Sequence, residues 1–187
     1  MKHYATIFAA AVIVAFSAAA NAANSLKAGS VALNVSAFDG TSDNSIYNAA
    51  LEVSDLYIIQ GKYFLQDDFA LLAGVGIGVN GGDANGTDFG IRAGARKYLS
   101  TGDFAPFVGG FLGYSSTHDS DVTITKIIGE FGAEYFFSKR FSVEGAARAG
   151  YASYEVPNSA LGIGGGGNYK GTYVGTASAG FSLNFYF

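Results

Sequence analysis

The stretch that decides the fold is "EFGAEYFFSKRFSVEGAARAGY", residues 130–151. Before the central "SKR", Phe131, Ala133, Tyr135 and Phe137 alternate with positions that include two glutamates. The alternation resumes after "SKR", with a glutamate and an arginine on the polar side. Side chains of a β-strand point alternately to opposite faces, so the pattern predicts two strands with one apolar and one polar face. The "SKR" between them predicts a tight turn.

The same plan of strand, short turn, strand and longer loop repeats along the chain. We expect eight strands, at residues 30–38, 56–65, 69–79, 87–99, 105–115, 122–137, 141–154 and about 172–187. The short turns are "QDD", "STGDF" and "SKR", and the longer loops are "FDGTSDNS", "NGGDANG", "STHDSD" and "EVPNSALGIGGGGNYKG". An even strand number with this asymmetry is typical of outer-membrane barrels. The sequence therefore predicts an all-β fold, an eight-stranded antiparallel up-and-down transmembrane β-barrel. A soluble β-sandwich, whose strands also alternate, is the alternative.

Composition also favours strands over helices. The 187 residues include 27 Gly, 12 Tyr and 16 Phe, and Gly costs about 1 kcal/mol at an interior helix position. The chain has no Cys, which excludes disulfides and thiolate metal sites.

The start of the chain predicts a cleavable signal peptide at residues 1–22. Lys2 supplies a positive end, residues 7–16 are apolar, and Ala20-Asn21-Ala22 fits a small-x-small cleavage site. An uncleaved membrane anchor is the alternative. Cleavage would leave residues 23–187 as one barrel domain, one unit more negative than the −4 of the whole chain. That charge disfavours nucleic acid as a partner, because nucleic acid needs a basic surface.

The chain ends on "FSLNFYF", in which Phe181, Leu183, Phe185 and Phe187 form one apolar face up to the last residue. Aromatic residues near strand ends predict an interfacial girdle of the kind found in membrane proteins. The candidates are Tyr57, Tyr63, Tyr135, Phe137, Phe141, Phe185 and Phe187.

The chain resembles the small eight-stranded outer-membrane barrels, namely the transmembrane domain of outer membrane protein A and the opacity-like surface proteins. The stretches that carry the resemblance are "YFLQDDFALLAGVGIG", "FAPFVGGFLGY", "GAEYFFSKRFSVEGAARAGY" and "FSLNFYF".

This resemblance implies export through the periplasm to the outer membrane of a Gram-negative bacterium. It also implies that Phe181, Leu183, Phe185 and Phe187 are a C-terminal assembly signal. The implied partners are outer-membrane lipid and lipopolysaccharide, the barrel-assembly machinery and periplasmic chaperones. A surface ligand of the loops is a further possible partner. We expect no counterpart here of the periplasmic peptidoglycan-binding domain of the larger relatives, so that role is not carried over.

Charged residues on the polar face predict a network inside the barrel. If Phe137 lies opposite Phe141, then Glu130 lies opposite Arg148 and Glu134 lies opposite Glu144. The second pair brings like charges together and needs a cation or a proton. Arg92 and Arg96 are candidates to reach it, with Val108 and Gly110 on the inward phase of the strand between and Gly110 leaving room. Two interpretations remain open, a structural plug of three Arg and three Glu or a gated ion path.

We expect a non-enzymatic protein with a structural or surface-interaction role and no catalytic, cofactor-binding or metal-binding residues. A narrow channel for ions or small solutes is the first alternative. A lipid-modifying enzyme is the second, because His118 lies in the loop "STHDSD" beside Asp119 and near Asp121. Adjacency in one loop supplies neither the geometry of a catalytic triad nor the oxygen ligands that calcium needs.

Overall fold

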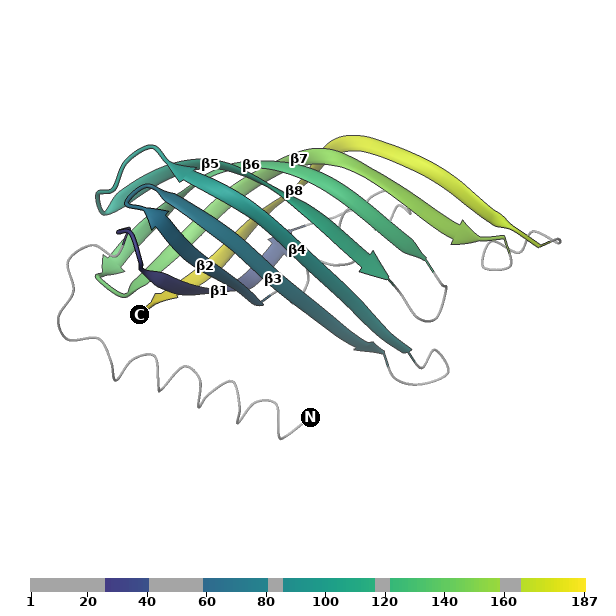
Figure 1. Cartoon of the computed structure of the whole chain (residues 1–187), viewed down its shortest axis with the longest axis horizontal. Helices are drawn as coiled ribbons and strands as arrows, with labels where there is room; N and C mark the ends of the chain where they lie inside the picture. The colour runs from purple at the N-terminus through teal and green to yellow at the C-terminus, as the bar shows by residue number, and fades with distance from the viewer. Residues whose placement is uncertain (1–25, 41–58, 81–85, 117–121, 159–165) are drawn as a thin grey trace.

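The structure, a computed structural model, describes residues 26–40, 59–80, 86–116, 122–158 and 166–187 (Figure 1). They form a closed antiparallel barrel in which successive strands pair and the first strand pairs with the last. The strands are β1 (Val31–Gly40), β2 (Ile59–Gln66), β3 (Phe69–Asn80), β4 (Gly86–Tyr98), β5 (Phe104–Ser116), β6 (Thr123–Ser138), β7 (Phe141–Pro157) and β8 (Asn168–Tyr186). The predicted eight-stranded up-and-down barrel is therefore confirmed. Among the residues described, no helix is long and apolar enough to cross a membrane.

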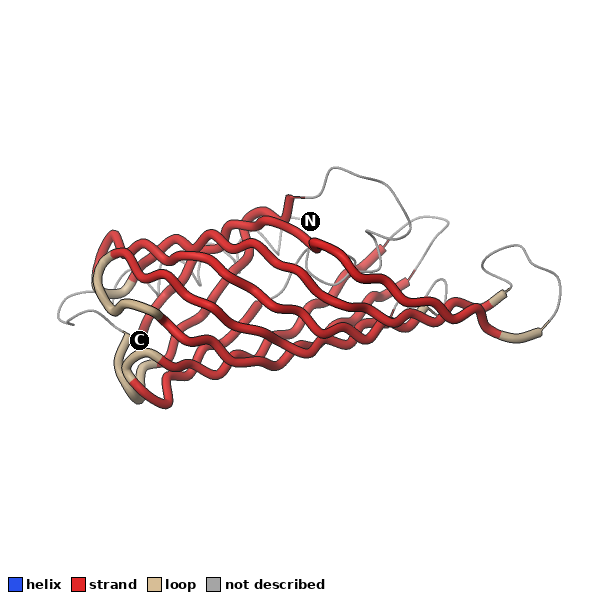
Figure 2. The backbone as a smooth tube through the Cα atoms, turned by 90° about the horizontal axis from the view of Figure 1, so that it is seen from above, coloured by secondary structure: helices blue, strands red, loops and turns tan. Residues whose placement is uncertain are grey.

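The last two strands are longer than predicted. β7 runs to Pro157 and β8 begins at Asn168, so both ends of the predicted loop at 155–171 belong to the sheet. The Asn158 N–H donates to the Gly167 carbonyl oxygen over 2.9 Å and continues the ladder past both strand ends. Figures 1 and 2 show this hairpin reaching beyond the other strands. Turn-forming residues in the segment concealed the extension, because their propensities favour a loop. Residues 56–58, the predicted start of the second strand, lie outside the described ranges.

The short connections lie together at one end of the barrel, near the C-terminus (Figure 1). There the Phe187 N–H donates to the Val31 carbonyl oxygen over 2.9 Å and ties the last residue to the first strand. The predicted pairing of Phe137 with Phe141 is wrong, because Ser138 pairs with Phe141 and Phe137 is the extra residue of a β-bulge. The predicted register holds along the rest of the ladder, from the Phe136–Ser142 pair to the Thr123–Glu155 pair.

Side chains alternate between the interior and the outer surface, but β5 has the opposite phase from the one predicted. Phe107 and Phe111 are buried inside, whereas Val108 is exposed on the outer face. The prediction that Val108 and Gly110 face inward is therefore wrong. Both faces of β5 carry large apolar residues, so alternation alone could not assign its phase. The pairing of Arg96 with Gly109 settles it, since partners across a ladder share a face.

The interior consists of three layers along the barrel axis. An aromatic layer lies near the short turns and contains Phe64, Tyr98, Phe107, Phe136 and Tyr186. A polar layer of buried charged side chains follows it. Toward the long loops lies a second apolar cluster, made of Phe111, Ile124, Ile128, Ala152, Tyr154 and Val156. The polar layer thus lies between the two apolar clusters along the axis, and one further buried cation, Lys126, lies opposite Ala152 at the level of the second cluster.

Candidate functional site

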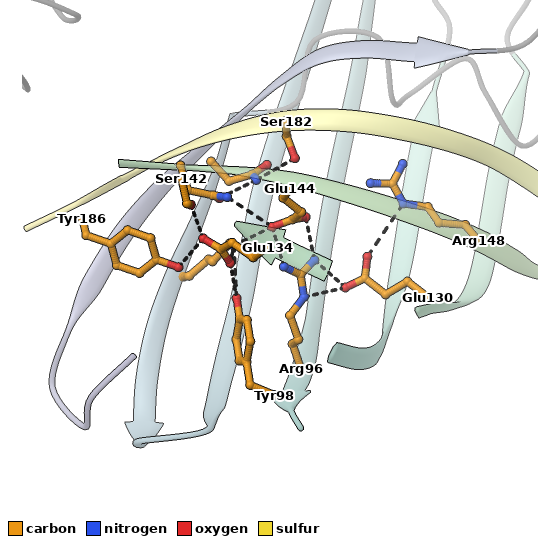
Figure 3. Close-up of polar contacts among 12 residues, drawn as sticks. Arg96, Tyr98, Glu130, Glu134, Ser142, Glu144, Arg148, Ser182 and Tyr186 are labelled. Atoms are coloured by element: carbon orange, nitrogen blue, oxygen red, sulfur yellow. Dashed lines mark hydrogen bonds and ion pairs between the residues drawn. The ribbon is translucent and has the colours of Figure 1, made fainter. Parts of the chain in front are cut away.

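The polar layer contains all six charged residues that the sequence placed inside the barrel. Arg92 and Arg96 come from β4, Glu130 and Glu134 from β6, and Glu144 and Arg148 from β7. Each side chain is buried, with at most 7% of its residue surface exposed. Figure 3 shows most of them converging within the barrel.

Arg96 is the centre of the layer. Its Nη2 donates to Glu130 Oε1 over 2.7 Å, and its Nη1 donates to Glu144 Oε2 over 2.7 Å. The guanidinium also lies 3.7 Å from the centre of the Phe107 ring. Gly109, opposite Arg96, leaves the space that was predicted for Gly110: a Cβ at Gly109 would lie 3.1 Å from Glu130 Oε1 and 2.8 Å from the Ala95 carbonyl oxygen.

Lys62 of β2 is a member of the layer that sequence reasoning missed. Its Nζ lies 3.0 Å from Glu134 Oε2 and 2.7 Å from Glu144 Oε2, so one ammonium bridges the two like charges. The bridge was predicted for Arg92 or Arg96, of which Arg96 contacts Glu144. The signal was present in the sequence, because Lys62 occupies the opposite phase from the apolar Ile59 and Tyr63 on the same strand.

Neutral side chains also donate hydrogen bonds to the two carboxylates. Glu134 accepts hydrogen bonds from the hydroxyls of Tyr98 over 2.7 Å, Tyr186 over 2.6 Å and Ser142. Glu144 accepts one from the Asn184 amide over 3.3 Å. A buried carboxylate with several donors is held in one position. These four polar partners lie on β4, β7 and β8 and carry no charge, which is why charge patterning did not reveal them.

The predicted pair of Glu130 and Arg148 lies in register, but the contact is long. Arg148 Nε is 3.8 Å from Glu130 Oε2, whereas Arg96 approaches the same carboxylate to 2.7 Å. Arg92 lies with its guanidinium carbon 5.1 Å from the centre of the Phe111 ring, toward the long loops. The layer therefore consists of a tight group around Arg96 and Lys62, with Arg92 and Arg148 at its edge.

The four apolar residues of the C-terminal stretch lie on the outer face of β8 and just beyond it. Phe181 and Phe187 are exposed, Leu183 and Phe185 are half-buried, and the alternate residues Ser182, Asn184 and Tyr186 are buried in the lumen. His118 and Tyr57 lie outside the described residues, so the predictions that concern them stay predictions.

No protein-family model matches the sequence, and a search of curated proteins finds no match. Among solved structures, the barrel is similar to the N-terminal β-barrel domain of OprF from Pseudomonas aeruginosa, with a TM-score of 0.52 and 18% identity over 86% of this chain and 98% of that one. It is also similar to the outer membrane protein OprG from the same organism, with a TM-score of 0.52 and 12% identity over 86% and 97% of the two chains. Ail, the attachment invasion locus protein of Yersinia pestis, matches with a TM-score of 0.39 and 10% identity over 84% and 99%. The chain therefore has the fold of the eight-stranded barrels of OprF and OprG.

Proposed function

We propose that the protein is an integral outer-membrane β-barrel with a structural or surface-interaction role, whose lumen is closed by the polar layer. The main support for the proposal is the apolar character of the outer surface. Every strand contributes large apolar side chains that are exposed there, among them Val31, Ile59, Leu71, Ile91, Leu112, Phe131, Tyr151 and Val174. Soluble monomers rarely expose contiguous apolar patches larger than a few hundred Å². This surface argues for lipid around the barrel and against the soluble sandwich.

Aromatic residues bound the apolar surface at a spacing that suits a membrane. Phe104 and Tyr114 on β5 are ten residues apart, as are Phe141 and Tyr151 on β7. At about 3.4 Å per residue and a strand tilt of roughly 40°, ten residues span about 26 Å along the axis. Outer-membrane barrels carry an apolar band about 25 Å tall between two aromatic girdles.

The outer face becomes polar where this band ends. Ile127, Tyr151 and Val174 lie side by side across β6, β7 and β8 and are exposed on the outer face. The next outward row consists of Thr125, Ser153 and Thr172, also exposed. The inward residues at that level are Ile124, Ala152 and Tyr154, together with the buried Lys126, which pairs with Ala152. An outer row of polar side chains suits water and not lipid, which supports a position outside the membrane for these ends of β6, β7 and β8.

The packing of the lumen supports a closed barrel. Eight strands enclose an interior just wide enough for side chains, and here the polar layer is stacked on the aromatic layer. A narrow channel, the alternative, would need a path for water through both layers. The other alternative, a lipid-modifying enzyme, depends on His118, and no contact among the described residues argues for it.

The outward position of Phe181, Leu183, Phe185 and Phe187 supports their proposed role as a C-terminal assembly signal, since a partner could reach them from the side of the barrel. Lipid and lipopolysaccharide are the proposed partners of the apolar band. The barrel-assembly machinery and periplasmic chaperones are the proposed partners during export. A surface ligand is proposed to bind the loops, which lie largely outside the described residues.

The test is the heat-dependent gel migration of the protein in fractions of Gram-negative cells that express the whole chain. Folded small barrels resist detergent until they are boiled. We expect the protein in the outer-membrane fraction, with a band that shifts on boiling. Recovery in the soluble periplasmic fraction, with one migration at all temperatures, would overturn the proposal.

A further inference from the structure

The β6–β7 hairpin contains a built-in repulsion. Glu134 and Glu144 are direct cross-strand partners, and both side chains point into the lumen and are buried. Like charges directly opposite one another destabilise strand pairing, and the effect grows away from water because the dielectric constant falls. A hairpin closed by a two-residue turn would otherwise be among the first parts of the chain to form, since its contacts are local.

The charges that relieve this repulsion come from distant parts of the chain. Lys62, which contacts both carboxylates, is 72 residues from Glu134 and 82 residues from Glu144. Arg96, which contacts Glu144, lies on β4. Within the hairpin, Ser142 donates a hydroxyl to Glu134, but a neutral donor leaves both negative charges in place.

The position of Lys62 links this relief to closure of the barrel. Lys62 lies on β2, where it pairs with Ala32 of β1. β1 in turn pairs with β8 along the closing seam, with Val35 opposite Leu183. When Lys62 reaches the two carboxylates, β2 carries its partner β1 toward β8, so the contact forms together with the closing seam.

We propose that Glu134, Glu144 and Lys62 form a closure device, which makes the pairing of β6 with β7 more favourable once β2 crosses the lumen and the barrel closes. Sheets with exposed edges are prone to pair with other chains. A hairpin whose pairing is weakened until closure shortens the time for which such edges exist. The device goes beyond the proposed function, since it concerns how the barrel forms and not what the finished barrel does.

The absence of Cys makes the order of pairing measurable. Pyrene attached to Tyr135→Cys and Val143→Cys, partners on the outer face, reports the hairpin through excimer emission. Pyrene attached to Val35→Cys and Leu183→Cys reports closure. During refolding of the full chain into lipid vesicles, we expect the two signals to rise together. With Glu144→Gln added, the hairpin signal should rise about five-fold faster, as expected from removing a like-charge pair, while the closure signal should not accelerate.

Lys62→Met should slow both signals together, and adding Glu144→Gln to it should restore the hairpin signal. A variant that simply fails to fold would not regain its hairpin signal, so this recovery distinguishes the closure device from a general folding defect. Lys97→Met is the matched control, because Lys97 lies on the barrel rim in an exposed pair with Asp68 and should leave the order unchanged. The delay between the hairpin signal and the closure signal should differ between the wild type and Glu144→Gln. Equal delays in the two proteins would overturn the inference.

The same measurement in detergent micelles separates this inference from the proposed function. Coupled signals in micelles without insertion into vesicles would count against the membrane barrel and leave the closure device standing. Uncoupled signals in both media would overturn the closure device alone.

Discussion

The guanidinium carbon of Arg96 lies 3.7 Å from the centre of the Phe107 ring. The ring covers the cation while Glu130 and Glu144 accept hydrogen bonds from its nitrogens. This arrangement uses both properties that distinguish Arg from Lys, the planar fork of donors and the ability to stack on an aromatic face. Arg96 joins the aromatic layer to the polar layer.

Replacing Arg96 should therefore destabilise the barrel more than replacing any exposed cation. Arg96→Met leaves two buried carboxylates short of a partner and should lower the free energy of unfolding by about 3–5 kcal/mol. Arg96→Lys should cost less, because the ammonium keeps the charge but loses the fork. Urea unfolding in lipid vesicles measures both. Lys97→Met, at the exposed pair with Asp68, should cost about 1 kcal/mol or less. Equal costs for Arg96→Met and Lys97→Met would contradict the central role of Arg96.

Glu130 should couple to Arg96 and not appreciably to Arg148, because the two distances are 2.7 Å and 3.8 Å. Two double-mutant cycles test this, one with Glu130→Gln and Arg96→Met and one with Glu130→Gln and Arg148→Met. We expect a coupling energy of about 1–3 kcal/mol in the first and below about 0.5 kcal/mol in the second. A larger value for Arg148 would show that the register partner, and not the nearer cation, holds Glu130.

Alternation and turn chemistry predicted the closed barrel and its eight strands, apart from the outer ends of β7 and β8. They also predicted that Glu130 lies opposite Arg148, although the Phe137–Phe141 pair from which that register was counted is wrong. They could not assign the phase of β5, where Phe107 and Val108 are both apolar. Nor could they show which cation reaches the Glu134–Glu144 pair, because Lys62 crosses the lumen from a strand that is distant in sequence. Contacts across a barrel depend on strand stagger and tilt, and neither is encoded in a period of two.

A lysine scan should locate the proposed membrane along β6. Phe131 lies on the outer face midway between Tyr135 and Ile127, whereas Thr125 shares that face beyond the apolar band. Phe131→Lys should cost about 2–4 kcal/mol in vesicles, and Thr125→Lys about 1 kcal/mol or less. Urea unfolding measures the two values. Similar small costs at both positions would argue that water, and not lipid, surrounds Phe131.

The wild-type protein should carry no steady ionic current in planar bilayers. Arg96→Ala should also stay closed, because Tyr98, Phe107, Phe136 and Tyr186 still fill the layer beneath it. The measurement is single-channel recording. Heat-dependent gel migration checks beforehand that each protein sample is folded. A steady current from the wild type would favour the narrow channel.

Phe187 offers a way to separate an assembly signal from a stabilising contact. Its side chain is 62% exposed on the outside, but its backbone N–H donates to the Val31 carbonyl oxygen at the closing seam. Phe187→Ala keeps that hydrogen bond and removes only the ring, whereas deletion of Phe187 removes both. If the ring is read during assembly, Phe187→Ala should lower the amount of folded protein in the outer membrane several-fold and leave unfolding in vesicles nearly unchanged. Val174→Ala, at an equally apolar and 75% exposed position of the same strand, is the matched control and should leave both unchanged. Deletion should lower both, since it also opens the seam. Wild-type levels of folded Phe187→Ala in cells would show that the aromatic ring is not part of the signal.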